Sequence, residues 1–159
     1  MNTRLRAVVV LFTAFVAAAT MIPAASAATT TPTLTNVRVG RHATFDRVVL
    51  DFNGSKPAEV IGKVVPELFY DGSGKPVNLN GTFFYEVVSR PAAAHDDNGN
   101  STYTGSRKFD TPSLSNVQAF ALTGDFEGHL TVGLGYRRAT WQSVSVLENP
   151  TRVVIDIGS

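Results

Sequence analysis

The residues that could perform chemistry in this chain are few and scattered. Its three histidines, His42, His95 and His129, each stand alone among turn or strand residues, without the spacing of a catalytic or metal-binding motif. The chain has no Gly-x-Ser-x-Gly elbow, no His-Glu-x-x-His motif and no cysteine. We therefore expect no catalytic residue, no cofactor and no metal site, and keep a zinc site built from the three histidines as a minor alternative.

Two glycine-containing stretches match ligand-binding loops only in part. The stretch "DGSGK" at 71–75 lacks the leading glycine of a phosphate loop, and Pro76 stands where a hydroxyl residue would begin a helix. The stretch "HDDNGN" at 95–100 offers Asp96 and Asn98 to calcium, but oxygen ligands are missing from the first and last positions of the loop pattern. The first is interpreted as a turn, and for the second a weak, irregular calcium site stays an alternative.

Two groups of cationic and aromatic residues follow apolar stretches and suit surface recognition. Arginine binds carboxylates bidentately and aromatic faces stack on sugar rings, so the mixture fits an anionic glycan better than a nucleic acid. The alternative is a solvated rim with Trp141 turned into the core. The first group is Arg38, Arg41 and His42, and the second is Tyr136, Arg137, Arg138 and Trp141.

One charged pattern occurs twice, as "FDRVVLDF" near the start and "PTRVVIDI" at the end. Within each copy the Arg and the Asp lie on one face of a strand but about 13 Å apart, so they cannot pair with each other. If the two strands run antiparallel side by side, Arg47 faces Asp156 and Asp51 faces Arg152. We predict these four as structural partners on two central strands, with ligand binding by the charges as the alternative. The shared core residues would be Val48, Leu50, Phe52, Val153, Ile155 and Ile157.

Most of the remaining sequence alternates between apolar and polar residues with period two, and no long segment shows a helical stripe. Turns rich in Gly and Asn separate the apolar stretches. The pattern predicts an all-β fold, an antiparallel β-sandwich or a flattened barrel with pseudo-symmetric halves. The eight expected strands lie within 36–40, 45–52, 58–65, 82–90, 115–124, 129–136, 143–148 and 151–157.

The longest stretch without a strand pattern is 91–113, which is polar, rich in glycine and flanked by prolines. Loops of this length are usually functional or disordered. We expect a mobile, exposed loop, with ordering on binding as the alternative.

The first 27 residues have the features of a secretory signal peptide. Arg4 and Arg6 precede an apolar run of 13 residues at 7–19, which is shorter than the roughly 20 residues that span a bilayer. Small residues follow and end at Ala27, where we expect cleavage. The mature protein is then secreted or associated with the cell wall, without stable membrane insertion.

The rest of the chain divides into a Thr-rich linker at 28–33 and one domain at 34–158. Without Arg4 and Arg6, 12 of the 14 basic residues remain against 13 acidic ones, so the formal net charge of the mature chain is −1. Nucleic-acid binding through bulk charge is therefore excluded, because it needs a clustered excess of Lys and Arg.

Several short stretches of the sequence occur in a recognisable order: "LTNVRVGRHATFDRVVLDF", "DGSGKPVNLNG", "PAAAH", "GDFEGHLTVGLGYR" and "VLENPTRVVIDI". Together they resemble the AMIN-like domain family of secreted and lipid-anchored bacterial envelope proteins, which is related to the AMIN domains that accompany cell-wall amidases. The resemblance covers 34–158. Trp141 and Gln142 stand where it leads us to expect a Phe-Arg pair.

The resemblance implies a non-enzymatic β-sandwich module, and AMIN domains direct partner enzymes to the cell wall. We therefore expect a secreted, non-catalytic module that recognises peptidoglycan or a related anionic wall polysaccharide. The alternative is a protein-interaction module that docks a wall-associated enzyme or secretion partner through 91–113 or an exposed sheet edge.

Overall fold

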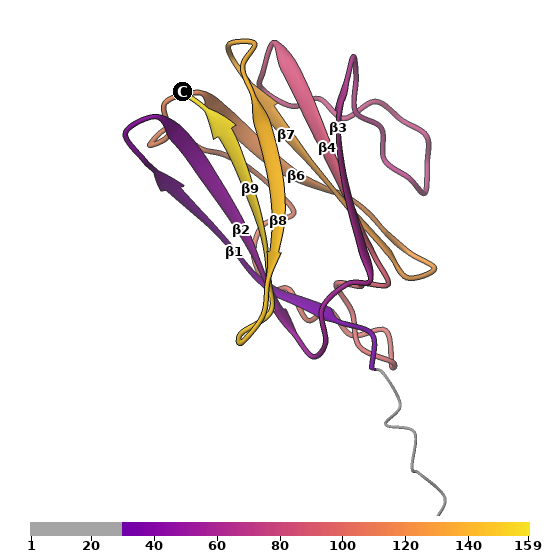
Figure 1. The fold of residues 1–159 in the computed structure, drawn as a ribbon. Helices are drawn as coiled ribbons and strands as arrows, with labels where there is room; N and C mark the ends of the chain where they lie inside the picture. The colour runs from indigo at the N-terminus through magenta and orange to yellow at the C-terminus, as the bar shows by residue number, and fades with distance from the viewer. Residues whose placement is uncertain (1–29) are drawn as a thin grey trace, which may run out of the picture.

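The computed structural model describes residues 30–159, so the predicted signal peptide and the start of the predicted linker lie outside the described residues. Nine antiparallel strands form two sheets that pack face to face, which confirms the predicted all-β sandwich (Figure 1). Sheet A has the order β1-β2-β9-β8, and sheet B has the order β3-β4-β7-β6-β5. Within the described part, no helix is long and apolar enough to span a membrane.

The eight predicted strands are all present, and one further short strand joins them. The elements are β1 (Thr33–Arg41), β2 (Phe45–Asn53), β3 (Glu59–Val65), β4 (Phe83–Arg90), β5 (Lys108–Asp110), β6 (Val117–Phe126), β7 (His129–Tyr136), β8 (Gln142–Leu147) and β9 (Arg152–Gly158).

The stretch 91–113 is exposed at 97–101 and 104–108, as its composition predicts, but other parts of it are packed against the fold. Ala92 and Ala94 are fully buried in the core between the sheets, and Tyr103 joins them there. Further on, β5 pairs with β6, and the Phe109 ring stacks on that of Phe120 with centroids 5.1 Å apart. The prediction was wrong for these residues because three consecutive alanines, one tyrosine and one phenylalanine within 91–113 give no periodic signal.

The main core lies between the two sheets and contains the apolar residues of the repeated charged pattern. The inward side chains of β2 and β9 are at most 4% exposed, and burial of each such side chain contributes about 1.5–3 kcal/mol before conformational entropy is counted. All six predicted core residues are among them: Val48, Leu50, Phe52, Val153, Ile155 and Ile157.

A second, smaller core covers the outer face of sheet B. The segment between β3 and β4 lies across β6 and β7 and places Leu68, Val77 and Leu79 against Ala119 and Ala121. Because the residues beneath the segment are alanine and glycine, its backbone can approach the sheet closely. Sheet B is therefore buried on part of both faces.

The two strands of the repeated pattern are the central strands of sheet A. They run antiparallel, with Arg47 opposite Asp156 and Asp51 opposite Arg152, as the sequence predicts. The repeated pattern makes the β8–β9 hairpin equivalent to the β1–β2 hairpin. The pair of Val49 and Val154 lies at the centre between them. The pseudo-symmetry therefore lies within one sheet and does not divide the sandwich into two halves.

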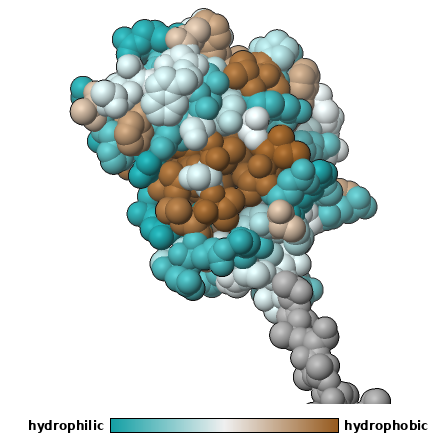
Figure 2. Space-filling view, in the orientation of Figure 1, coloured by the Kyte–Doolittle hydropathy of each residue, from teal (hydrophilic) through white to brown (hydrophobic). Residues whose placement is uncertain are grey.

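On one side of the sandwich, edge strand β8 of sheet A and edge strand β3 of sheet B face each other. Figure 2 shows a hydrophobic area on this side, over β8 and β3. Val60, Val144 and Val146 pack against the core from these edges, and Ile61 and Leu147 are exposed beside them. The two edges belong to separate sheets, so the fold is a sandwich and not a closed barrel.

Candidate functional site

The register of sheet A brings parts of the two predicted groups into one row at one end of the sheet. Phe45 on β2 is opposite Gly158 on β9, and the Gly158 N–H donates to the Trp141 carbonyl. On the other side, the His42 N–H donates to the Phe45 carbonyl. The side chains of His42, Phe45 and Trp141 form what we call the aromatic row.

The rings of this row lie close enough to make one continuous surface. The His42 and Phe45 rings stack with centroids 4.3 Å apart and planes at 14°, and the Phe45 and Trp141 rings are 6.1 Å apart and tilted by 54°. A Cβ at Gly158 would overlap the Trp141 indole, so the glycine gives the indole its place over β9. Trp141 is 52% exposed, and the alternative that it turns into the core is therefore wrong.

Arg47 lies beside the aromatic row and is paired there with a carboxylate. Its guanidinium carbon lies 5.1 Å from the centre of the Phe45 ring, within the range of a cation–π contact. Its Nε and Nη2 donate to the two carboxylate oxygens of Asp156 at 2.7 and 2.8 Å. This bidentate pairing raises the pKa of Arg47 above its ordinary value. The predicted cross-strand partnership of Arg47 and Asp156 is confirmed.

The second predicted ion pair is replaced by another. Asp51 accepts hydrogen bonds from Nε and Nη2 of Arg38, both at 2.7 Å, and this contact holds the pKa of Asp51 below its ordinary value. Arg152 lies opposite Asp51, but its Nε donates to the Pro150 carbonyl. Arg38 is thus engaged in an ion pair with Asp51 and lies outside the aromatic row, four residues before His42 in the chain.

Two further residues of the predicted groups lie apart from the aromatic row. Arg41 is opposite Asp46, whose side chain points inward, so it extends from the other face of sheet A than His42 does. Tyr136 is only 1% exposed, its ring packs on Phe83, and its hydroxyl accepts a hydrogen bond from Gln142. Since β7 turns this ring into the core, Tyr136 cannot contact a large ligand.

Arg137 and Arg138 are exposed on the turn that leads from β7 to Trp141. The buried Asn116 fixes this turn: its Oδ1 accepts from the N–H groups of both arginines, and its Nδ2 donates to the Gly158 carbonyl at 2.7 Å. Neither side chain forms an ion pair with any residue between 30 and 159. Their backbone is therefore fixed while their charges stay available.

The sequence reasoning missed residues that hold this end of the molecule together. Asp46 is fully buried, and its carboxylate accepts hydrogen bonds from the backbone N–H groups of Ser115, Asn116 and Val117. The sequence could have indicated this role of Asp46, because the two-residue period of a strand places its carboxylate on the inward face of β2. Phe45 was also missed, although it lies opposite a glycine and so has room for aromatic neighbours.

The histidines outside the row have local partners. His95 Nδ1 lies 2.9 Å from the Asp125 carboxylate, and His129 Nδ1 lies 3.1 Å from the Glu127 carbonyl. The Asp96 carboxylate accepts N–H groups of its own loop. Between residues 30 and 159, no group of three or more His, Asp or Glu side chains could hold a metal ion.

Comparison with known proteins gives the family of this fold. No curated protein and no solved structure matches the chain. The family model of the AMIN-like domain matches residues 32–159, a range that includes all nine strands. The chain therefore belongs to the AMIN-like domain family, whose members occur in cell-envelope proteins.

Proposed function

We propose that the aromatic row binds a polysaccharide of the cell wall, peptidoglycan or a related anionic polymer, and that the protein is a secreted, non-catalytic wall-binding module. The observation that carries the proposal is the half-exposed Trp141, which is aligned with Phe45 and His42 along one end of sheet A. An aromatic surface of this kind suits the apolar face of a sugar ring.

The charges around the row support an anionic ligand. Arg47 is held beside Phe45, and Arg137 and Arg138 are exposed on the turn before Trp141. Guanidinium groups bind carboxylates bidentately, and Arg137 and Arg138 have no ion-pair partner within residues 30–159, whereas the guanidinium of Arg47 is already paired with Asp156. Membership of a family of non-catalytic envelope modules agrees with a role in binding.

The test is co-sedimentation of the protein with purified, insoluble cell wall. Trp141→Ala is expected to abolish pelleting, while the thermal transition stays within about 4 °C because a half-exposed side chain leaves no closed cavity. Phe126→Ala is the matched control, because Phe126 is 68% exposed on sheet B and outside the row. A folded Trp141→Ala protein that pellets as fully as the unchanged protein would overturn the proposal.

Arg137→Ala tests the electrostatic part of the same proposal. Its binding to the wall is expected to weaken more at low than at high ionic strength, because salt screens an exposed charge. Equal loss at all salt concentrations would show that Arg137 contributes by contact and not by charge.

A further inference from the structure

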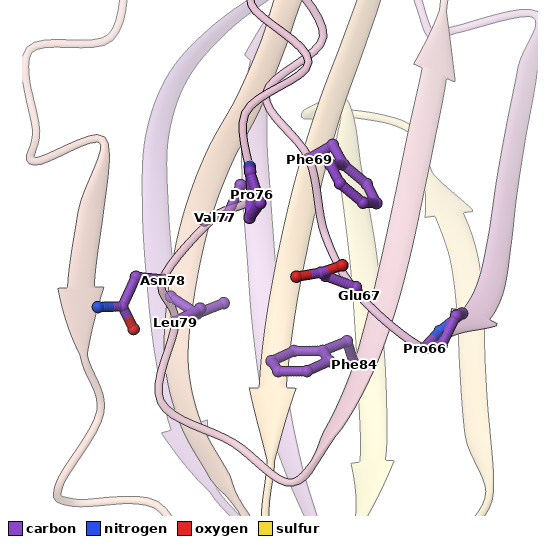
Figure 3. Close-up of a pocket in the computed structure, with 8 residues that line it drawn as sticks. All are labelled: Pro66, Glu67, Phe69, Pro76, Val77, Asn78, Leu79 and Phe84. Atoms are coloured by element: carbon purple, nitrogen blue, oxygen red, sulfur yellow. The ribbon is translucent and has the colours of Figure 1, made fainter.

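A groove of about 620 Å³ lies on the outer face of sheet B, away from the aromatic row. One wall is the chain that leaves β3, the other is the returning part of the segment before β4, and the floor includes Phe84 of β4 (Figure 3). Its apolar surface comes from both walls and the floor. The lining includes Pro66, Glu67, Phe69, Val77, Leu79 and Phe84.

Backbone hydrogen bonds hold the two walls at a fixed distance. Val77 N–H donates to the Leu68 carbonyl at 2.8 Å, and Tyr70 N–H donates to the Lys75 carbonyl at 2.9 Å. The far wall is tied to β5, because Lys108 Nζ donates to the Asn78 carbonyl at 2.8 Å. The groove therefore exists before any ligand enters, which lowers the entropic cost of binding.

Phe69 shows that the apolar lining is not explained by folding alone. Its neighbour Leu68 is 1% exposed and fills the small core on sheet B, whereas Phe69 is 44% exposed and is one of the residues that line the groove. Both walls also end in prolines, Pro66 and Pro76. Such a rigid apolar surface is typical of a binding site for an extended chain.

The charge of the groove defines the ligand. Glu67 lines the groove together with Phe69 and Phe84, and in Figure 3 its carboxylate points from its own wall toward the opposite one. Glu67 has no ion-pair partner and no side-chain hydrogen bond within residues 30–159. A carboxylate and the faces of two phenyl rings all attract a cation, and none of them attracts an anion.

We propose that this groove binds an arginine side chain of a partner protein, with the guanidinium on the Glu67 carboxylate and against Phe69 and Phe84. Arginine fits better than lysine, because its planar guanidinium matches a carboxylate, stacks on aromatic faces and loses less hydration in an apolar groove. This site is independent of the proposed wall-binding row, because it lies on the other sheet.

The experiment is a titration of the ¹⁵N-labelled protein with the peptide acetyl-Gly-Leu-Arg-Leu-Gly-amide, followed by NMR. The expected result is saturable shifts confined to the amides of 67–69 and 77–84. The same peptide with citrulline, which keeps the shape of arginine without its charge, should bind at least about fivefold more weakly, and a lysine peptide should lie between them.

Variants separate this site from any other surface. Glu67→Gln and Phe69→Ala should each lower the affinity about fivefold or more. Glu127→Gln and Phe126→Ala are the matched controls, because they remove an exposed carboxylate and an exposed phenyl ring on another part of sheet B. Both controls should bind as the unchanged protein does.

Three results would overturn the proposal. One is equal binding of the citrulline and arginine peptides, and another is unchanged affinity of Glu67→Gln. The third is an absence of saturable shifts in the groove up to about 5 mM peptide. The affinity would then be weaker than a specific site for a single side chain should have. Tighter binding of the lysine peptide would overturn the choice of arginine.

Discussion

Two carboxylates that are equivalent in the repeated pattern, Asp51 and Asp156, have partners that are not equivalent. Asp156 is held by Arg47 across the centre of sheet A, whereas Asp51 is held by Arg38 from the edge strand β1. The cause is a difference between the two edge strands. Arg38 on β1 lies opposite Val49, and the equivalent residue on β8, opposite Val154, is Ser145. A serine cannot compete for Asp156, so only one of the two predicted pairs forms.

A double-mutant cycle of Arg47 and Asp156 measures the pair that does form. The bidentate contact is half-buried, so its coupling free energy should lie between that of exposed pairs, about 0–1 kcal/mol, and that of buried pairs, about 3–5 kcal/mol. We expect about 1–2 kcal/mol from urea unfolding of the two single variants Arg47→Ala and Asp156→Ala and of the double variant. Additivity within about 0.5 kcal/mol would contradict it.

The Arg38–Asp51 pair should make stability depend on pH in the acid range. In the folded protein, the hydrogen bonds from Arg38 hold the pKa of Asp51 below the ordinary value of 3.8. Their stabilisation is therefore fully present above about pH 3.8 and is lost as the pH falls through the lower pKa of the folded state. The difference in unfolding free energy between the unchanged protein and Asp51→Asn should shrink over this range. A difference that stays constant from about pH 6 to pH 2 would contradict it.

At the scale of the elements, β6 and β7 are shaped by what lies on them. Gly135 has the backbone of Asn80 and Gly81 directly above it, and Gly133 has the Leu68 side chain. These glycines let the segment before β4 lie against the sheet, and this segment forms the groove of Figure 3. The small residues of β7 therefore position a surface that they do not themselves line.

Gly135→Ala should displace the segment that covers sheet B. The new Cβ would overlap the Asn80 carbonyl, and overpacking of this kind costs about 1–3 kcal/mol. Gly72→Ala is the control, because it lies in the same segment and a Cβ there meets nothing within 4 Å. Thermal unfolding of both variants gives the comparison. Equal transition temperatures would show that the backbone contact at Gly135 is not tight.

The strands were largely predictable from the sequence, and the reason is visible in β2 and β9. Each carries an arginine and an aspartate four residues apart on one face and apolar residues on the other, and only an antiparallel arrangement gives each arginine an opposite charge. The short β5 was not predictable, because three residues are too few for a period. The segment that covers sheet B was not predictable either, because glycine and alanine in a strand do not reveal which chain lies over them.

The aromatic row was predictable only as separate parts. The sequence places His42 after one strand and Trp141 before another, about a hundred residues apart, and no local pattern joins them. They meet because β2 lies beside β9, which sets Phe45 opposite Gly158. Recognition of the repeated pattern gave this pairing, so extension of its register by one more row would have identified Phe45.

At the scale of the whole molecule, one carboxylate joins the two sheets at the end that carries the aromatic row. Asp46 on β2 of sheet A accepts three backbone N–H groups from 115–117, where β6 of sheet B begins. Asp46→Ala should cost about 3 kcal/mol or more, because buried N–H groups lose their acceptor. Asp97→Ala, at an exposed aspartate, is the control. Urea unfolding is the measurement, and equal stability of the two variants would contradict the role of Asp46.

The position of β9 in the chain has a consequence for how the protein is made. This last strand lies between β2 and β8, and Ser159 N–H donates to the Thr44 carbonyl. Before β9 arrives, β2 has no partner on one side and β8 has no sheet to join, so most of sheet A cannot assemble. A chain emerging from the ribosome therefore cannot complete sheet A, and with it the core between the two sheets, until residues 152–158 are free.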